Sequence, residues 1–160
     1  MSLAPDYYVD SVLDVAYETL WQKNIRGLIY DIDNTLAHFD KPYTSTKVVE
    51  MLEKLKKMGF KICLCTNNTN NRLKLFDHLQ LDGVAYALKP LTRGVRQCML
   101  KMNTNAKQTA IIGDQLFADV WAGKNAGITT VLLKPLTEKD FFFVKFKRVF
   151  ERWMLQRYFK

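Results

Sequence analysis

The chain has 160 residues, a formal net charge of +8 and a hydrophobic fraction of 48%. This length suits one domain with a proper core, and the composition is typical of a soluble globular protein. No apolar run reaches about 18 residues, which excludes a membrane-spanning helix, and the N-terminus lacks the basic and apolar regions of a secretory signal.

Apolar runs alternate with helical periodicities along the chain. The helical pattern is clear over residues 45–58, where apolar residues share one face and Gly59 follows at the position where a helix would end. Before the first strand we expect only one or two helical turns, between Tyr7 and Trp21. In chain order, we expect strands over residues 25–30, 60–65, 84–87, 109–112 and 129–132, and helices over 45–58, 70–79, 92–102, 116–126 and 137–158.

This alternation predicts an α/β fold, a single doubly wound parallel sheet of the Rossmann-like kind. Its expected parts are an N-terminal helical segment (1–24), a core (25–135) and a basic amphipathic C-terminal helix (136–160). Ligands of such sheets bind at the carboxyl ends of the strands, so polar residues that follow the expected strands should form one site. These residues are Asp31, Asp33, Thr66, Lys89 and Asp114.

The most informative strand end is Asp31-Ile32-Asp33-Asn34-Thr35-Leu36, which follows the apolar run 27–30. Ionised carboxylates are costly to bury without a cation or a chemical role. Two carboxylates one residue apart can divide labour, one as a nucleophile and the other moving protons. Together with Asp114 and Asp119, which follow a later apolar run, they favour metal-assisted phosphoryl transfer through an aspartyl-phosphate.

Each of these residue types has a structural alternative when it is taken alone. A lone Asp-x-Asp is often a loop cap, a lone Thr a turn cap and a lone Lys a solvated surface residue. His38 is either a substrate contact or a solvated loop histidine. The three cysteines are Cys63, Cys65 and Cys98. They are either reduced thiols in the core or, for the Cys-x-Cys pair, ligands of a metal site, although the sequence shows no second pair of ligands.

Four motifs stand in the order and spacing of a known enzyme superfamily. They are Asp31-Ile32-Asp33-Asn34-Thr35, Cys63-Leu64-Cys65-Thr66-Asn67, Lys89-Pro90 and Gly113-Asp114-Gln115-Leu116-Phe117-Ala118-Asp119. Over roughly residues 25–133 the chain thereby resembles the haloacid dehalogenase (HAD) superfamily of phosphatases. The resemblance implies a phosphomonoesterase that uses Mg²⁺.

The resemblance also implies a role for each acid of the site. Asp31 would be the nucleophile on phosphorus, and Asp33 would protonate the leaving oxygen and then activate the hydrolytic water. Mg²⁺ would be held by Asp31, the backbone carbonyl of Asp33 and Asp114, since hard oxygen ligands suit this ion. Asp119 would hold the lysine of the third motif, or the metal-binding loop, in place.

The remaining motif residues would bind the phosphate. Thr66 and the Asn67 N–H would bind phosphoryl oxygens, and Lys89 would neutralise charge on the transferred group. The gaps between the motifs leave no room for the cap domain that many HAD enzymes place over small substrates. An open site suits a phosphate presented by something large, such as a protein, a nucleic acid or a membrane surface.

A narrower resemblance is to the capless subfamily IIIA phosphatases of the YqeG type, which are related to phosphatidylglycerophosphate phosphatases. It rests on the first, third and fourth motifs together with Gln115 and the spacing Gly123-x-Asn125-x-x-Gly127, and it runs from about residue 3 to residue 135. The implied substrate is the phosphomonoester of phosphatidylglycerophosphate. The implied location is cytoplasmic, with peripheral attachment to the inner face of a membrane.

The last 22 residues, 139–160, carry seven basic residues against two acidic ones, a net charge of +5. On a helix, Phe142, Phe146 and Trp153 would share one side while Arg148 and other basic residues share the opposite side. Such a helix suits contact with an anionic membrane. The alternatives are packing of the apolar side on the core and packing on a second subunit in a homo-oligomer.

Two other functions stay open at this point. The first is a phosphatase for a soluble metabolite or a polynucleotide phosphate end, although no recognised nucleic-acid motif accompanies the positive charge. The second is a non-catalytic module that binds phosphate. The presence of both Asp31 and Asp33 disfavours that second function, because a binding module needs no nucleophile and no proton carrier.

Overall fold

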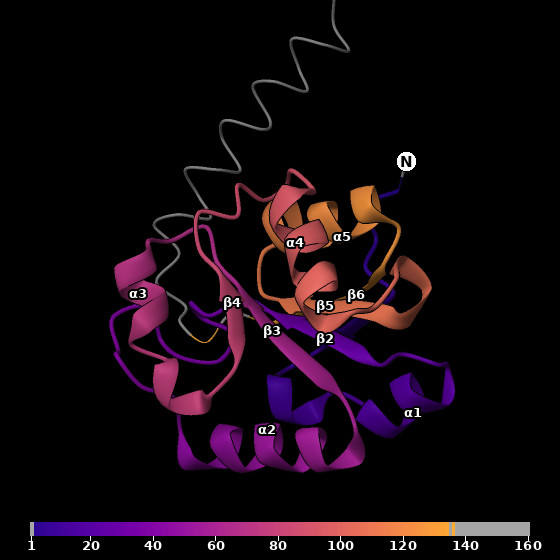
Figure 1. The fold of residues 1–160 in the computed structure, drawn as a ribbon. Helices are drawn as coiled ribbons and strands as arrows, with labels where there is room; N and C mark the ends of the chain where they lie inside the picture. The colour runs from indigo at the N-terminus through magenta and orange to yellow at the C-terminus, as the bar shows by residue number, and fades with distance from the viewer. Residues whose placement is uncertain (1, 135, 137–160) are drawn as a thin grey trace, which may run out of the picture.

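The fold is a parallel sheet with helices on both faces (Figure 1). The computed structural model describes residues 2–134 and 136, so the helix expected over residues 137–158 lies outside the described residues. Within them the strand order is β1-β6-β5-β2-β3-β4, and every neighbouring pair is parallel. The strands are β1 (Tyr7–Val9), β2 (Gly27–Tyr30), β3 (Lys61–Cys65), β4 (Asp82–Val84), β5 (Thr109–Gly113) and β6 (Thr129–Leu133).

The helices alternate with the strands, which confirms the α/β fold predicted from the sequence. They are α1 (Tyr17–Gln22), α2 (Thr46–Met58), α3 (Asn70–Lys74), α4 (Arg93–Met102) and α5 (Trp121–Ala126), with short turns η1 (Val12–Asp14), η2 (Asp77–Leu79), η3 (Ala106–Gln108) and η4 (Leu116–Val120). Helices α1 and α2 lie on one face of the sheet, and α4 and α5 lie on the other (Figure 1).

The two faces bury separate apolar clusters, because successive side chains of a strand point to opposite sides of the sheet. On β2, Leu28 and Tyr30 belong to the cluster with α1 and α2, whereas Ile29 belongs to the cluster with α4 and α5. Strands β2 and β5 are buried along their whole length, as expected for inner strands that are covered on both faces. Residues at their carboxyl ends are therefore held by a rigid frame.

The N-terminal segment contains a strand that the sequence did not predict. Strand β1 pairs with β6 where only helical turns were expected, and the turns follow as η1 and α1. Just before β1, the Asp6 carboxylate accepts hydrogen bonds from the Thr130 N–H (2.8 Å) and hydroxyl (2.9 Å) and lies 2.8 Å from Lys124 Nζ. A strand of three residues is too short to show an alternating pattern.

The helix expected over residues 116–126 begins with a π-turn, η4, which leads into α5. Turns of this kind occur often at functional sites. Here the turn buries Asp119, whose Oδ2 accepts a hydrogen bond from the Gln115 N–H at 3.1 Å. A Cβ at Gly113 would overlap the Asp119 carboxylate, so the glycine before Asp114 allows the close approach of these two elements.

The carboxyl edge of the sheet carries no inserted domain. Residues 31–45 form one loop between β2 and α2, and only α3 and η2 stand between β3 and β4. The predicted absence of a separate cap domain is thus confirmed for residues 2–134. No helix within the described ranges combines the length and hydropathy that a membrane crossing requires.

We expect Asp6→Ala to lower the free energy of unfolding by about 1–2 kcal/mol, because the buried Thr130 N–H and hydroxyl would lose their acceptor. Chemical denaturation measures the change. The matched control is Asp10→Ala at an exposed position, which should change the free energy of unfolding by less than about 0.5 kcal/mol. An Asp6→Ala protein as stable as the unmodified chain would show that this contact does not anchor β1.

Candidate active site

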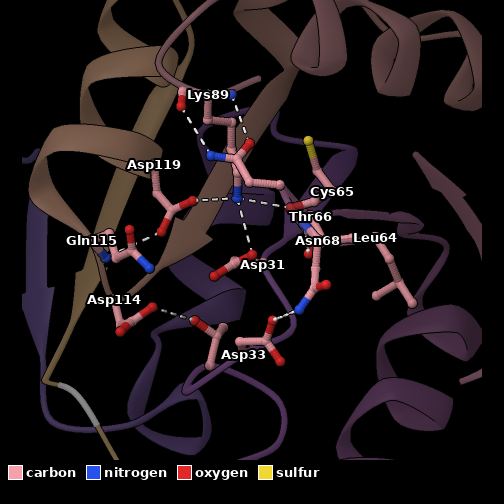
Figure 2. Close-up of polar contacts among 12 residues, drawn as sticks. Asp31, Asp33, Leu64, Cys65, Thr66, Asn68, Lys89, Asp114, Gln115 and Asp119 are labelled. Atoms are coloured by element: carbon pink, nitrogen blue, oxygen red, sulfur yellow. Dashed lines mark hydrogen bonds and ion pairs between the residues drawn. The ribbon is translucent and has the colours of Figure 1, made fainter. Parts of the chain in front are cut away.

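Three neighbouring strands end at the candidate site. Asp31 follows β2, Thr66 follows β3 and Asp114 follows β5. After β4 the chain crosses to β5 on the other side of β2, so the direction of winding changes between β2 and β5. Ligands of doubly wound sheets bind at this switch point, and Asp31 and Asp114 stand on its two sides (Figure 2).

Lys89 enters this cluster from the loop after β4. Its Nζ donates to Asp31 Oδ1 at 3.0 Å, to Asp119 Oδ1 at 2.6 Å and to the Cys65 carbonyl at 2.8 Å (Figure 2). The Lys89 side chain is 2% exposed. All three hydrogens of the ammonium group thus have acceptors, and Lys89 is a fixed buried cation rather than a solvated surface lysine.

Asn67 fixes the backbone of Lys89. Its Oδ1 accepts a hydrogen bond from the Lys89 N–H at 2.7 Å, and its Nδ2 donates to the Lys89 carbonyl at 2.9 Å. These two bonds hold the loop after β4 against the turn after β3. The Asn67 side chain therefore has a positioning task that the sequence analysis did not foresee, while the assignment of its N–H to a phosphoryl oxygen stays a prediction.

Two carboxyl groups of the site, Asp31 and Asp114, have raised pKa values. Burial raises the pKa of Asp31 to about 7, although Lys89 acts to lower it. Burial and the charges of Asp119 and Asp31 raise the pKa of Asp114 to about 8. Burial would lower the pKa of Lys89, but the charges of Asp119 and Asp31 outweigh it and raise that pKa above its ordinary value. One ammonium group thus faces three carboxylates, and a further cation would relieve their repulsion.

Oxygen atoms of Asp31, Asp114 and Asp119 lie within 4.8 Å of one another, a grouping that could hold a metal ion. Both oxygens of Asp119 already accept hydrogen bonds, from Lys89 and from the Gln115 N–H. Asp114 accepts a long bond of 3.4 Å from the Thr35 hydroxyl. Asp31 and Asp114 are therefore the better placed ligands, and a hard divalent cation fits such oxygen donors.

Asp33 stands at the edge of the cluster. Its Oδ2 accepts a hydrogen bond from Asn68 Nδ2 at 3.1 Å, and its Oδ1 accepts one from Arg72 Nε at 2.8 Å. The sequence analysis missed both partners. The position of Asn68, two residues after Thr66, was a usable signal, whereas Arg72 is one of two Lys/Arg residues on the expected helix and nothing local distinguishes it from Lys74.

The other predicted residues take simple positions. The Thr66 hydroxyl oxygen accepts a hydrogen bond from the Asn68 N–H at 3.0 Å, so the residue does cap a turn, while its hydroxyl hydrogen can still be donated to a ligand. His38 is exposed in the loop after β2. The three cysteines are buried and free, and they pack in the cluster on the α4 side of the sheet.

Comparisons with known proteins agree with this geometry. A family model described as haloacid dehalogenase-like hydrolase matches residues 35–127. The chain is 33% identical to the "Probable phosphatase YqeG" of Bacillus subtilis over 152 residues, which cover 94% of this chain and 88% of that protein.

Two solved structures share the fold. NagD from Escherichia coli K-12 aligns with a TM-score of 0.60 and 16% identity, over 73% of this chain and 91% of that one. The cobalt-bound deoxy-D-mannose-octulosonate 8-phosphate phosphatase from Haemophilus influenzae aligns with a TM-score of 0.52 and 19% identity, over 69% of this chain and 78% of that one. At such identities the likeness concerns the fold alone.

We expect Mg²⁺ to stabilise the protein more strongly as the pH rises. Because the folded-state pKa values of Asp31 and Asp114 are raised to about 7 and 8, their contribution to the stability of the metal-free protein is full below about pH 4 and is lost as the pH rises toward those values. Mg²⁺ would take the place of the bound protons. Thermal melts at acidic and at mildly alkaline pH, with Mg²⁺ or with EDTA, measure the effect.

The controls for this experiment are two single substitutions. Asp114→Asn should reduce the rise in Tm that Mg²⁺ produces, whereas Asp40→Asn, at an exposed position, should leave it unchanged. Equal Mg²⁺-dependent rises in Tm at both pH values would contradict the competition between protons and the metal ion.

Proposed function

The chain belongs to the haloacid dehalogenase-like hydrolases and is a phosphatase of that family, and we propose that it acts through an aspartyl-phosphate on Asp31 with Mg²⁺ as its cofactor. The observation that carries this proposal is the 3.0 Å contact between the buried Asp31 carboxylate and the buried Lys89 ammonium group, beside Asp114. A nucleophile and a cation that can neutralise phosphoryl oxygens thus lie in direct contact.

In the first step, an Asp31 oxygen attacks phosphorus and forms an O–P bond while the bond to the leaving oxygen breaks. Lys89 neutralises negative charge on the transferred group, and the Thr66 hydroxyl and the Asn67 N–H donate hydrogen bonds to its oxygens. Asp33 gives its proton to the leaving oxygen, which departs as an alcohol.

In the second step, a water molecule attacks phosphorus and the O–P bond to Asp31 breaks. Asp33, now a carboxylate, takes the proton of the water, so inorganic phosphate leaves and the Asp31 carboxylate is restored. The bond between Lys89 and Asp119 keeps the ammonium group in place through both steps. Mg²⁺ held by Asp31, the Asp33 carbonyl and Asp114 would supply the charge neutralisation that lets a carboxylate approach an anionic phosphate.

The proposed substrate is phosphatidylglycerophosphate at a membrane surface, with phosphatidylglycerol as the product. A cavity of about 330 Å³ beside the site supports this class, because most of its lining residues are apolar and Thr35, whose hydroxyl contacts Asp114, also lines it. Its apolar lining residues include Val12, Leu13, Leu36, Tyr43, Val48 and Leu136. His38 and Lys41 also line the cavity, which fits a ligand that carries hydrocarbon next to anionic groups.

A peripheral place on the inner, cytoplasmic face of a membrane follows from the same proposal. The absence of an inserted cap over residues 31–134 leaves the site open to a phosphate at a surface. The sequence 139–160, with a net charge of +5, would add attraction to an anionic leaflet of about 1 kcal/mol for each basic residue near the surface. A phosphorylated lipid and an anionic membrane are therefore the proposed partners.

The first test of this proposal measures inorganic phosphate released from phosphatidylglycerophosphate in anionic vesicles, with Mg²⁺ or with EDTA. We expect Mg²⁺-dependent release that Asp31→Asn lowers by several orders of magnitude, since this change removes the nucleophile. Release from p-nitrophenyl phosphate without release from the lipid would keep the phosphatase and reject the lipid substrate.

If phosphate is released from p-nitrophenyl phosphate but not from the lipid, two other kinds of substrate remain, a polynucleotide phosphate end and a soluble metabolite. Binding that weakens steeply with salt would identify a polynucleotide phosphate end, and binding with little dependence on salt would indicate a soluble metabolite. A protein that binds phosphate but releases none from either substrate would instead be a non-catalytic binding module.

The cavity gives a separate prediction. We expect Leu13→Asp to lower the rate on vesicle-borne phosphatidylglycerophosphate by about tenfold, because a charge would enter the apolar wall, while the rate on p-nitrophenyl phosphate stays unchanged. The matched control is Leu100→Asp, an exposed leucine on α4 that does not line the cavity. If Leu13→Asp and Leu100→Asp behave alike on the lipid, the cavity does not bind the hydrocarbon part of the substrate.

A further inference from the structure

Arg72 on α3 is a largely buried cation to which the mechanism above gives no task. Its Nε donates to Asp33 Oδ1 at 2.8 Å, and its side chain is 10% exposed. The two terminal nitrogens of the guanidinium group donate to the His38 carbonyl at 3.0 Å and to the Lys41 carbonyl. The group also lies 5.0 Å from the centre of the Phe76 ring. Arg72 thus connects α3 to Asp33 and to the loop after β2.

Both carboxylate oxygens of Asp33 accept hydrogen bonds from side chains of the segment after β3. Arg72 binds Oδ1, and Asn68 binds Oδ2 at 3.1 Å (Figure 2 shows the second bond). A carboxylate oxygen can accept about two hydrogen bonds, so the two contacts fix the orientation of the carboxylate and still leave acceptor sites for a proton. A rotation of the Asp33 side chain would break both contacts.

The backbone of Arg72 is fixed by the turn that carries the phosphate-binding residues. Helix α3 begins directly after Thr69, whose hydroxyl oxygen accepts a hydrogen bond from the Arg72 N–H at 3.3 Å. Thr69 follows the turn of Thr66, Asn67 and Asn68 by one residue. The same short stretch therefore positions the phosphate site and the guanidinium group that holds Asp33.

We infer that Arg72 is a positioning residue for the two proton transfers of Asp33. It holds the Asp33 carboxylate in the orientation from which a proton reaches the leaving oxygen, and it keeps the loop of His38 and Lys41 against α3. The planar guanidinium group suits this task, because one carboxylate and two separate carbonyl groups must be bound at once. The compact ammonium group of a lysine does this less well. The inference rests on the proposed function, since it requires Asp33 to act as general acid and base.

The test compares kcat/KM for phenyl phosphate and for p-nitrophenyl phosphate in the full chain with Mg²⁺. Phenolate is a poor leaving group that needs a proton, whereas p-nitrophenolate leaves without one, and kcat/KM reports the steps up to formation of the aspartyl-phosphate. We expect Arg72→Gln to lower kcat/KM for phenyl phosphate by about 10–100-fold and for p-nitrophenyl phosphate by less than about threefold.

Three variants complete the comparison. Lys74→Gln, at an exposed position on the same helix, should change neither substrate. Arg72→Lys should restore part of the loss on phenyl phosphate, and it replaces Arg72→Gln in the comparison if the latter does not fold. Asp33→Asn should reproduce the selective loss on phenyl phosphate, because it removes the acid itself.

The outcomes separate the inference from the proposal on which it rests. A selective loss in Asp33→Asn but not in the Arg72 variants would overturn the positioning role and leave the function of Asp33 intact. An unchanged rate on phenyl phosphate in Asp33→Asn would overturn the proposed acid and the inference together. An equal loss on both substrates in the Arg72 variants would reduce Arg72 to a structural role and reject the inference.

Discussion

The site depends on one buried ammonium group. Lys89 Nζ contacts Asp31, Asp119 and the Cys65 carbonyl, and it receives no appreciable exposure to water. Without this cation, three carboxylates would face one another in a region of low dielectric constant, where an unpaired charge costs several kcal/mol. The two hydrogen bonds between Asn67 and the Lys89 backbone therefore matter to the whole site, because they bring the loop after β4 back to the centre of the sheet.

The charge of the site is opposite to that of the chain. The protein carries a net charge of +8, yet its centre gathers the carboxylates of Asp31, Asp114 and Asp119 around one lysine. A net positive charge of the chain favours the approach of anionic ligands. The local excess of carboxylates then makes binding of a divalent cation favourable. Such a cation would neutralise the negative charge that otherwise repels a phosphate. A basic protein with an acidic centre is thus well suited to phosphoryl transfer.

Part of the site that sequence reasoning located is set by local chain geometry, whereas the place of Asp119 beside Lys89 came from the resemblance of the motifs. Asp31 and Asp114 directly follow buried apolar strands, and a parallel sheet brings such strand ends together whatever the loops do. The partners of Asp33 escaped prediction for the opposite reason. The Arg72–Asp33 pair spans 39 residues, and the pair exists only because α3 packs beside the loop after β2. Strand β1 was missed because three residues show no periodicity.

The order of buried strands and amphipathic helices, and the acids at the strand ends, were determined by the sequence itself, because hydrophobic periodicity and strand direction are local properties. The tertiary structure decided the geometry in which these side chains meet, and it added contacts that no motif implied, such as those of Asp33 with Asn68 and Arg72. It brought Lys89 between Asp31 and Asp119, and it turned Asp119 inward through the π-turn η4. These contacts join residues that are far apart in the chain, and their geometry follows from how helices and loops pack against the sheet rather than from any pattern within one segment.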